Sequence, residues 1–468
     1  MEEFEHHGIW WIPEQSDKKV SGTLRFYPAD NASLDLIGSF KDVTELNIFQ
    51  QPNIILGLTS DGKKVTLHKC YESKSSLSMP GFLKTSFVVS VVFIGHHFER
   101  KEDIIFDSLS LNYSNLDEWA GISGFHQKLD TNSEGHLSRA EINYSYPQKV
   151  EAQLKDFRIS LNYQFTMSGA FSEFKLKQTT FLKIETHKPT HFDDYMDMCY
   201  HVQNFLSLAE GKAVYPLSIK AKARGCQTTL SDGKVVYNDI FIFYPIRDSS
   251  KSVKQLSRYD MLFSFQDISA DFEKCFKNWF AKSETLKPVY DLYFGTLYNS
   301  SMYLHHEFLS LVQAMETYHR RTHDGKYLPD EDYLKETYPA LINAIPQTVS
   351  ASFRESLKRK LIYLNEFSLR KRLEEILESC GELTNPLINN KVEFIEDVVN
   401  TRNYLTHFDK ELEAKAKTGE DLYKLAQKMR FILEVCLLKE LGIADTTIGD
   451  LISRNQKYQH LRHNLLGS

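Results

Sequence analysis

The sequence predicts an α+β multidomain protein, in which a β-rich N-terminal domain is followed by an all-helical C-terminal domain. Three observations lead to this fold class. Over residues 1–190, short runs alternate between apolar and polar residues, which is typical of half-buried strands. Over residues 291–468, apolar residues recur at steps of three and four, as they do on one face of a helix. The length of 468 residues is also sufficient for about three domains of ordinary size.

The composition excludes several classes of protein. Apolar residues make up 42% of the chain, charged residues 25% and aromatic residues 13%, which is typical of a folded protein and excludes disorder and collagen-like repeats. The chain has 56 Lys and Arg residues against 62 Asp and Glu residues, so its formal net charge is −6. A basic coat over the whole surface is therefore excluded, whereas a local basic groove for nucleic acid is not.

The cysteines and the N-terminus indicate a cytoplasmic protein. The six cysteines are too widely spaced for a CxxC zinc clip. The segment Met1–Glu5 is acidic, whereas a secretory signal peptide begins with basic and then apolar residues. No run approaches the 18 apolar residues of a transmembrane helix. We therefore expect reduced cysteines and no membrane partner.

The strands of residues 1–190 are expected to form a mostly antiparallel sandwich or barrel-like domain, because only short turns separate them. The alternating or apolar runs lie at 8–12, 20–27, 33–40, 86–95, 103–113, 157–165 and 175–186. A mixed α/β connecting region follows over residues 191–290. It has helical spacing over 192–206 and strands around 213–245, with a hairpin turn at 231–234. The domain over 291–468 contains several amphipathic helices, and a long one ends at Gly442.

The most informative segment is residues 400–408, which lie in a predicted amphipathic helix. Asn403 and His407 are four residues apart and share a helix face, so the amide could orient the imidazole. Arg402 and His407 are five residues apart, which separates them by about 140° around the helix and about 7.5 Å along it. A compact cluster of these groups therefore requires two copies of the helix, related by a two-fold axis.

Such a cluster suits the cleavage of RNA without a metal ion. Histidine can take a proton from a ribose 2′-OH or give one to the leaving 5′-oxygen. Arginine can hold the phosphate and stabilise the charge that develops in the transition state. Because the 2′-OH is the nucleophile, the expected product is a 2′,3′-cyclic phosphate, and DNA should resist. We interpret Arg402 and His407 as the catalytic pair, with Asn403 in support.

The segment Arg402–His407 matches the RxxxxH motif of the HEPN ribonuclease superfamily, and Phe308–Glu316 resembles the first long helix of that fold. The whole chain, including its Gly8–Trp11 start, resembles the ApeA family of bacterial antiphage proteins. This resemblance implies a C-terminal HEPN helical bundle and an N-terminal domain that senses or controls. It also implies a metal-independent endoribonuclease of abortive infection that acts as a homodimer or a higher even-numbered homo-oligomer. RNA, with transfer RNA as one candidate, would be its substrate, and a phage-derived molecule its trigger.

Other charged residues complete the predicted site. Arg402 lies beside the apolar stripe of its helix, so it requires a carboxylate partner or an interface, and Glu316 is the expected carboxylate.

Three basic clusters are candidates for binding RNA phosphates. They are Arg320 and Arg321; Lys358, Arg359 and Lys360; and Arg370, Lys371 and Arg372. Acidic residues lie between them, so ordinary solvated helix faces are the alternative.

Two patterns resemble metal sites, but we assign no metal or other cofactor. Residues 130–141 fit the spacing of an EF-hand calcium loop. The following residues alternate and reach Pro147, so no exiting helix is expected, and a polar loop between strands is the preferred interpretation. His319 and His323 have the spacing of a metal-binding pair, but a chain with 17 histidines contains such pairs by chance. Motifs for nucleotide hydrolysis, dinucleotide binding, serine hydrolysis and zinc proteolysis are absent from the sequence.

Two other classes of function stay open. The helical domain could be a regulatory module that binds nucleic acid or a small ligand without cutting it. Alternatively, Arg402 could be an interface residue of a structural or toxin-neutralising protein. Loss of cleavage with retained binding in a His407 variant would favour the enzyme over the binding module. The interface alternative instead predicts that Arg402→Ala disrupts oligomerisation and that there is no nuclease activity to lose.

Overall fold

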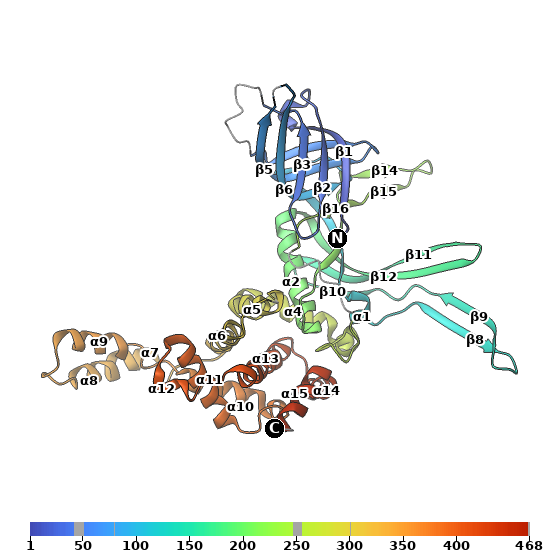
Figure 1. The fold of residues 1–468 in the computed structure, drawn as a ribbon. Coiled ribbons are helices and arrows are strands. Elements are labelled where there is room, and N and C mark those ends of the chain that lie inside the picture. Colours follow the sequence, from blue (N-terminus) through green and yellow to red (C-terminus); the bar gives the residue numbers. More distant parts are fainter. Residues whose placement is uncertain (42–50, 79, 247–254, 300, 467–468) are drawn as a thin grey trace. The chain divides into compact units, whose positions relative to one another are not determined.

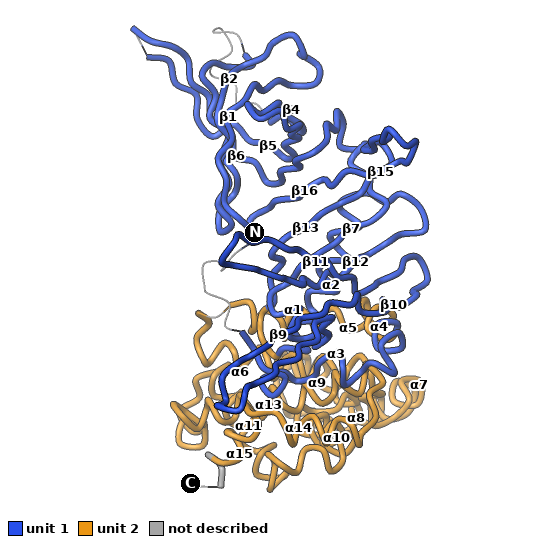
Figure 2. The backbone as a smooth tube through the Cα atoms, turned by 90° about the vertical axis from the view of Figure 1, so that its right-hand side faces the viewer, with its two compact units in different colours: residues 1–210, 214–277 blue, residues 211–213, 278–468 orange. Residues whose placement is uncertain are grey.

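The computed structural model describes residues 1–41, 51–78, 80–246, 255–299 and 301–466 (Figure 1). The chain forms two compact units, residues 1–210 with 214–277 and residues 211–213 with 278–468 (Figure 2). The first unit is rich in strands and the second is all-helical, which confirms the predicted fold class.

The first unit contains strands β1 to β16 and helices α1 to α3. The strands are β1 Phe4–Trp11, β2 Val20–Phe26, β3 Ala32–Ile37, β4 Ile54–Thr59, β5 Lys64–Leu77, β6 Leu83–Ile94, β7 Ile105–Tyr113, β8 Phe125–Thr131, β9 Leu137–Tyr144, β10 Val150–Gln153, β11 Phe157–Ala170, β12 Glu173–His191, β13 Pro216–Lys222, β14 Gln227–Thr229, β15 Val235–Tyr237 and β16 Ile240–Phe243. The helices are α1 Leu116–Ala120, α2 Phe192–Glu210 and α3 Phe265–Ile268.

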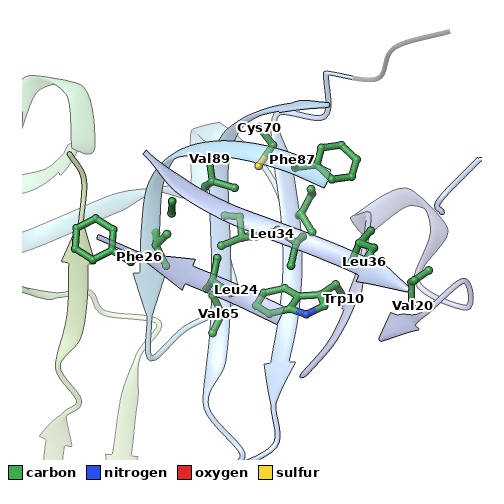
Figure 3. Packing of buried hydrophobic residues seen from close by; sticks show 14 of the residues in the cluster. Trp10, Val20, Leu24, Phe26, Leu34, Leu36, Val65, Cys70, Phe87 and Val89 are labelled. Atoms are coloured by element: carbon green, nitrogen blue, oxygen red, sulfur yellow. The ribbon is translucent and has the colours of Figure 1, made fainter. Parts of the chain in front are cut away.

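Six strands close into an antiparallel barrel, in the order β6, β3, β2, β1, β4 and β5, with β5 paired back onto β6. Alternate residues of β2 and β3 point inward, as their burial patterns show. The interior is filled by large apolar side chains, including those of Trp10, Leu24, Leu34 and Phe87 (Figure 3). The indole of Trp10 donates a hydrogen bond of 3.2 Å to the carbonyl oxygen of Gly22. The buried indole is therefore satisfied without water.

The sheet continues beyond the barrel through β6. One edge of β6 pairs with β3 over residues 84–89 and then with β16 over residues 92–94. From β16 the order runs through β13, β7, β12 and β11 to β10. Helix α2 contacts β7 and β12 and buries Tyr195, Val202 and Phe205, as its helical spacing predicts.

Two predicted turns lie at the tips of hairpins. Leu230 N–H donates to Lys234 O at 2.9 Å between β14 and β15, which confirms the predicted turn at 231–234. Residues 130–141 form the end of the β8–β9 hairpin, where Asn132 Oδ1 accepts hydrogen bonds from the backbone of Glu134 and His136. A strand follows the turn where an EF-hand would have a helix, so this segment is a polar hairpin turn.

The second unit contains helices α5 to α15, and α4 leads into it. The helices are α4 Phe272–Ala281, α5 Ser283–Tyr298, α6 Leu304–Thr322, α7 Asp330–Asp332, α8 Tyr338–Asn343, α9 Ala351–Leu361, α10 Leu369–Cys380, α11 Lys391–His407, α12 Lys410–Glu413, α13 Gly419–Glu440, α14 Asp445–Arg454 and α15 Gln456–Leu466.

Helix α13 is the centre of the helical unit. It is buried along most of its length, from Leu422 to Leu438. Helices α6, α10, α11 and α14 contact it. The apolar stripe of α6, which includes Phe308, Leu311 and Met315, is buried as its spacing predicts. Within the described ranges, no helix has both the length and the hydrophobicity needed to cross a membrane.

Candidate functional site

The predicted motif lies in the last two turns of α11. Asn390 caps the start of this helix, where its Oδ1 accepts from Glu393 N–H at 3.2 Å and its amide donates to the Glu393 carboxylate at 3.2 Å. Phe394 and Val398 are buried against the rest of the unit. The helix ends where Phe408 takes a left-handed conformation (φ 53°, ψ 38°). Phe408 itself is exposed and caps the helix, so the predicted helix, which includes residue 408, extends one residue too far.

Arg402 is a half-buried cation with no carboxylate partner among the described residues. Its Nη1 donates a hydrogen bond of 3.1 Å to Oδ1 of Asn403. Its carbonyl oxygen accepts a hydrogen bond of 2.7 Å from the Thr406 hydroxyl. The guanidinium therefore keeps most of its donors for another group, which an interface or an anionic ligand could supply.

His407 is exposed and is the last residue of α11. In the part of the chain that the structure describes, its imidazole forms no hydrogen bond or ion pair. Asn403, which shares a helix face with this ring and is predicted to orient it, is instead bonded to Arg402. The amide thus positions the guanidinium, and the imidazole stays available to an external partner.

A neighbouring segment supports the motif helix. Thr401 is fully buried, and its hydroxyl accepts a hydrogen bond of 3.0 Å from the backbone of Lys417. The Lys417 ammonium lies 3.2 Å from the carboxylate of Asp397, one turn earlier on α11. These contacts hold residue 417 against α11 and restrict motion of the helix end.

The expected pairing of Glu316 with Arg402 is not found. Glu316 accepts a hydrogen bond of 3.1 Å from Arg320, four residues later on α6. Arg320 also donates to Glu366 at 2.6 Å, and this bond is the main cause that raises its pKa. Glu316 therefore sits in a surface ion-pair network on α6.

Arg372 belongs to a predicted RNA-binding cluster, and its burial contradicts this role. Only 2% of the residue is exposed, and its guanidinium donates to the Phe367 carbonyl and to His319 Nδ1, both at 3.0 Å. His319 Nε2 lies 2.8 Å from the Glu375 carboxylate, so the network assigns the proton to Nε2. Both ring nitrogens of His319 are thus occupied, and its ring stacks on that of His323 at 4.6 Å. This histidine pair is a packing feature.

The other basic residues lie at the surface of the helical unit. Arg321, Lys358 and Lys360 have no charged partner among the described residues. The remaining pairs are Arg359 with Glu355 at 3.6 Å, Arg370 with Glu396 at 4.0 Å, and Lys371 with Glu374 and Glu375 at 3.9 Å. Helix α9, which carries residues 358–360, has no buried residue.

Sequence reasoning missed a buried polar cluster in this unit. The carboxylate of Glu434 accepts hydrogen bonds from the hydroxyls of Tyr293, at 2.7 Å, and Tyr458. Arg430, one turn earlier on α13, donates to Glu307 at 2.9 Å. Most of these partners lie on different helices, far apart in the sequence, so no local motif could reveal them.

Two of the clefts among the described residues are formed without any residue of the motif. One of about 480 Å³ in the helical unit is lined by residues that include Cys380, Glu382, Asp445 and Arg462. The other, of about 420 Å³ in the β-rich unit, is lined by residues that include His96, His97 and Arg224. The described residues contain no group of three or more His, Cys, Asp or Glu side chains that could hold a metal ion.

Two known family models match the chain, one over its N-terminal part and one over its C-terminal part. Residues 5–279 match the family model described as ApeA N-terminal domain 1. Residues 309–447 match the model described as Apea-like HEPN, and this range includes all of α11. No curated protein and no solved structure matches the chain.

Proposed function

This chain belongs to the ApeA family, and from that membership we propose that it is a metal-independent endoribonuclease of abortive-infection antiphage defence. One observation carries the proposal. Within the part of the chain that matches the Apea-like HEPN family, α11 presents a half-buried arginine and, five residues later, an exposed histidine, and neither has a charged partner among the described residues. A histidine for proton transfer and an arginine for charge stabilisation suit the cleavage of RNA by its 2′-OH.

Two protomers are needed to assemble the site. On one copy of α11, Arg402 and His407 point about 140° apart. A two-fold axis beside α11 would bring two arginines and two histidines together, and it would cover the half-buried guanidinium. We therefore propose a homodimer, or a higher even-numbered homo-oligomer, as the active form.

Each motif residue then has a distinct role. Arg402 binds the scissile phosphate and stabilises the charge that builds on its oxygens. His407 takes the proton from the 2′-OH or delivers one to the leaving 5′-oxygen. Asn403 is a positioning residue, because its Oδ1 holds the Arg402 guanidinium at 3.1 Å and fixes the direction of the remaining donors.

The surface of α9 is the best-supported RNA contact outside the motif. Residues 358–360 are three consecutive cations, and only Arg359 has a charged partner among the described residues. Phe353 in α9 is 53% exposed, and Tyr363, two residues after the end of α9, is 68% exposed. Exposed aromatic rings beside unpaired cations suit single-stranded RNA, whose bases stack and whose phosphates bind Lys and Arg.

The proposal is tested by incubating the purified full chain with total cellular RNA in EDTA. We expect cleavage by the wild type and its loss in Arg402→Ala and His407→Ala. Arg139→Ala and His136→Ala are matched controls, since both residues are exposed on the β8–β9 hairpin, and they should cleave normally. If the wild type is silent alone, lysate from phage-infected cells is added as a source of trigger. RNA binding without cleavage under both conditions would support the non-catalytic alternative.

A further inference from the structure

The helical unit contains two buried cysteines in contact with each other. Cys380 is the last residue of α10 and Cys436 lies in α13. Their Sγ atoms are 3.7 Å apart, although the residues are separated by 56 positions in the sequence. Each residue is only 1% exposed, and both are free thiols. No other cysteine lies in residues 278–468.

The two cysteines differ in their distance from a cleft. Cys380 lines the cleft of about 480 Å³, together with polar residues such as Glu382, Asp445 and Arg462. Cys436 is not among the residues that line it. A small reagent that enters the cleft therefore meets Cys380 before Cys436.

The surroundings also differ between the two thiols. A hydrogen bond from Cys436 lowers the pKa of Cys380, and the positive charge of Lys439 acts in the same direction. The same hydrogen bond and burial raise the pKa of Cys436 well above its usual value. Because the thiolate is the reactive form, these effects favour Cys380 as the attacking group.

We propose that Cys380 and Cys436 are a peroxide-sensitive dithiol that is converted to a disulfide between α10 and α13. The Cys380 thiolate attacks one peroxide oxygen, the O–O bond breaks, and a sulfenic acid forms as the second oxygen leaves and takes up a proton as water. The Cys436 thiol then attacks the sulfenic sulfur, the S–S bond forms and a second water leaves. Each thiol loses one electron and one proton overall, and one peroxide is reduced to two waters.

The disulfide requires only a short approach of the two sulfur atoms. Closing the Sγ atoms from 3.7 Å to a bond of about 2.05 Å is a small shift. Cys380 is the last residue of α10, because Gly381 follows it with φ 59° and ends the helix. The disulfide would enclose residues 381–435, which include all of α11. Oxidation would therefore constrain the segment that carries the predicted catalytic motif.

The test treats reduced full-length protein with hydrogen peroxide, alkylates the remaining thiols in denaturant and maps the digest by mass spectrometry. We expect a cross-linked peptide joining Cys380 to Cys436 that has lost two hydrogen atoms and is restored by dithiothreitol. Cys70 and Cys275, which are buried in the other unit, should stay alkylatable. Equal alkylation of all six cysteines after peroxide would overturn the proposal.

Two variants test the order of attack. In Cys436→Ser, the sulfenic acid should accumulate at Cys380 and be trapped by dimedone that is added together with denaturant. In Cys380→Ser, the remaining Cys436 should react far more slowly, and faster reaction there would contradict the assigned roles. A third measurement uses the wild-type protein. The melting temperature of the helical unit should be higher by roughly 5–15 °C in the oxidised protein than in the reduced protein. This test is independent of nuclease activity.

Discussion

Replacing Glu434 by alanine tests the buried polar cluster at the centre of the helical unit. The carboxylate is 1% exposed and accepts hydrogen bonds from two buried hydroxyls, those of Tyr293 and Tyr458. A hydrogen bond to a charged acceptor contributes about 1.5–3 kcal/mol, so the loss of two gives about 3–6 kcal/mol. Removing one member of a buried charged network typically costs about 3–5 kcal/mol. We therefore expect the free energy of unfolding to fall by about 4 kcal/mol.

Hydrogen exchange measured by mass spectrometry reports this change for the helical unit alone. The slowest amides of α13 should exchange about a thousand-fold faster in Glu434→Ala, because about 1.4 kcal/mol corresponds to a factor of ten. Peptides of β6, in the other unit, should not change. Tyr293→Phe removes one of the two donors and should accelerate exchange less. Glu378→Ala changes an exposed residue of α10 and should stay within about 0.5 kcal/mol of the wild type. An acceleration below about ten-fold in natively folded Glu434→Ala would refute the reasoning.

Three further predictions concern other parts of the chain. Burial lowers the pKa of His319 below its usual value of 6.5. As the pH falls, this imidazole is therefore protonated in the unfolded chain before it is protonated in the folded one, so the helical unit should lose stability below pH 6.5. His319→Gln should make the melting temperature depend less on pH between about pH 7.5 and about pH 5.5. An unchanged dependence on pH would contradict the role of this buried ring beside Arg372. Replacing residues 358, 359 and 360 together by alanine should weaken RNA binding, and it should reduce the slope of log Kd against log salt concentration by about 2. An unchanged slope would show that these residues do not contact the RNA phosphates. Gly57→Ala would bring a Cβ within 2.2 Å of the Trp10 ring and should destabilise the barrel by about 1–3 kcal/mol in urea unfolding, so a neutral effect would show that the ring can shift.

The sequence predicted those elements whose pattern is local. Alternation located β2, β3 and β7, and spacings of three and four located α2, α6 and α13. It missed β4, because Ile54–Leu58 is a nearly continuous apolar run that fits either a buried strand or a buried helix. Closure of the barrel also depends on β1 pairing with β4 and on β3 pairing with β6, which join segments far apart in the sequence and have no local sequence signature.

In the candidate site, too, the local helix could be predicted from the sequence, whereas the partners of its side chains could not. The helix that carries Arg402 and His407 follows from the spacing of its apolar residues. Its end does not, because the predicted helix includes residue 408 whereas α11 ends at His407. The partners of these groups do not follow from the spacing either, because a side chain selects among several residues within reach. Thus Asn403 bonds to Arg402 rather than to His407, and Arg372, which belongs to a basic cluster in the sequence, is buried against His319.

The most direct test of the central claim is the chemistry of the RNA ends. Wild-type protein, activated with lysate from phage-infected cells if needed, is incubated with cellular RNA in EDTA, and the fragment ends are mapped. The account predicts 2′,3′-cyclic phosphates facing 5′-hydroxyls, absent with His407→Ala and Arg402→Ala, and resistance of a substrate with a 2′-deoxyribose at the cleaved position. Fragments with 5′-phosphates, or cleavage that survives in both variants, would contradict it.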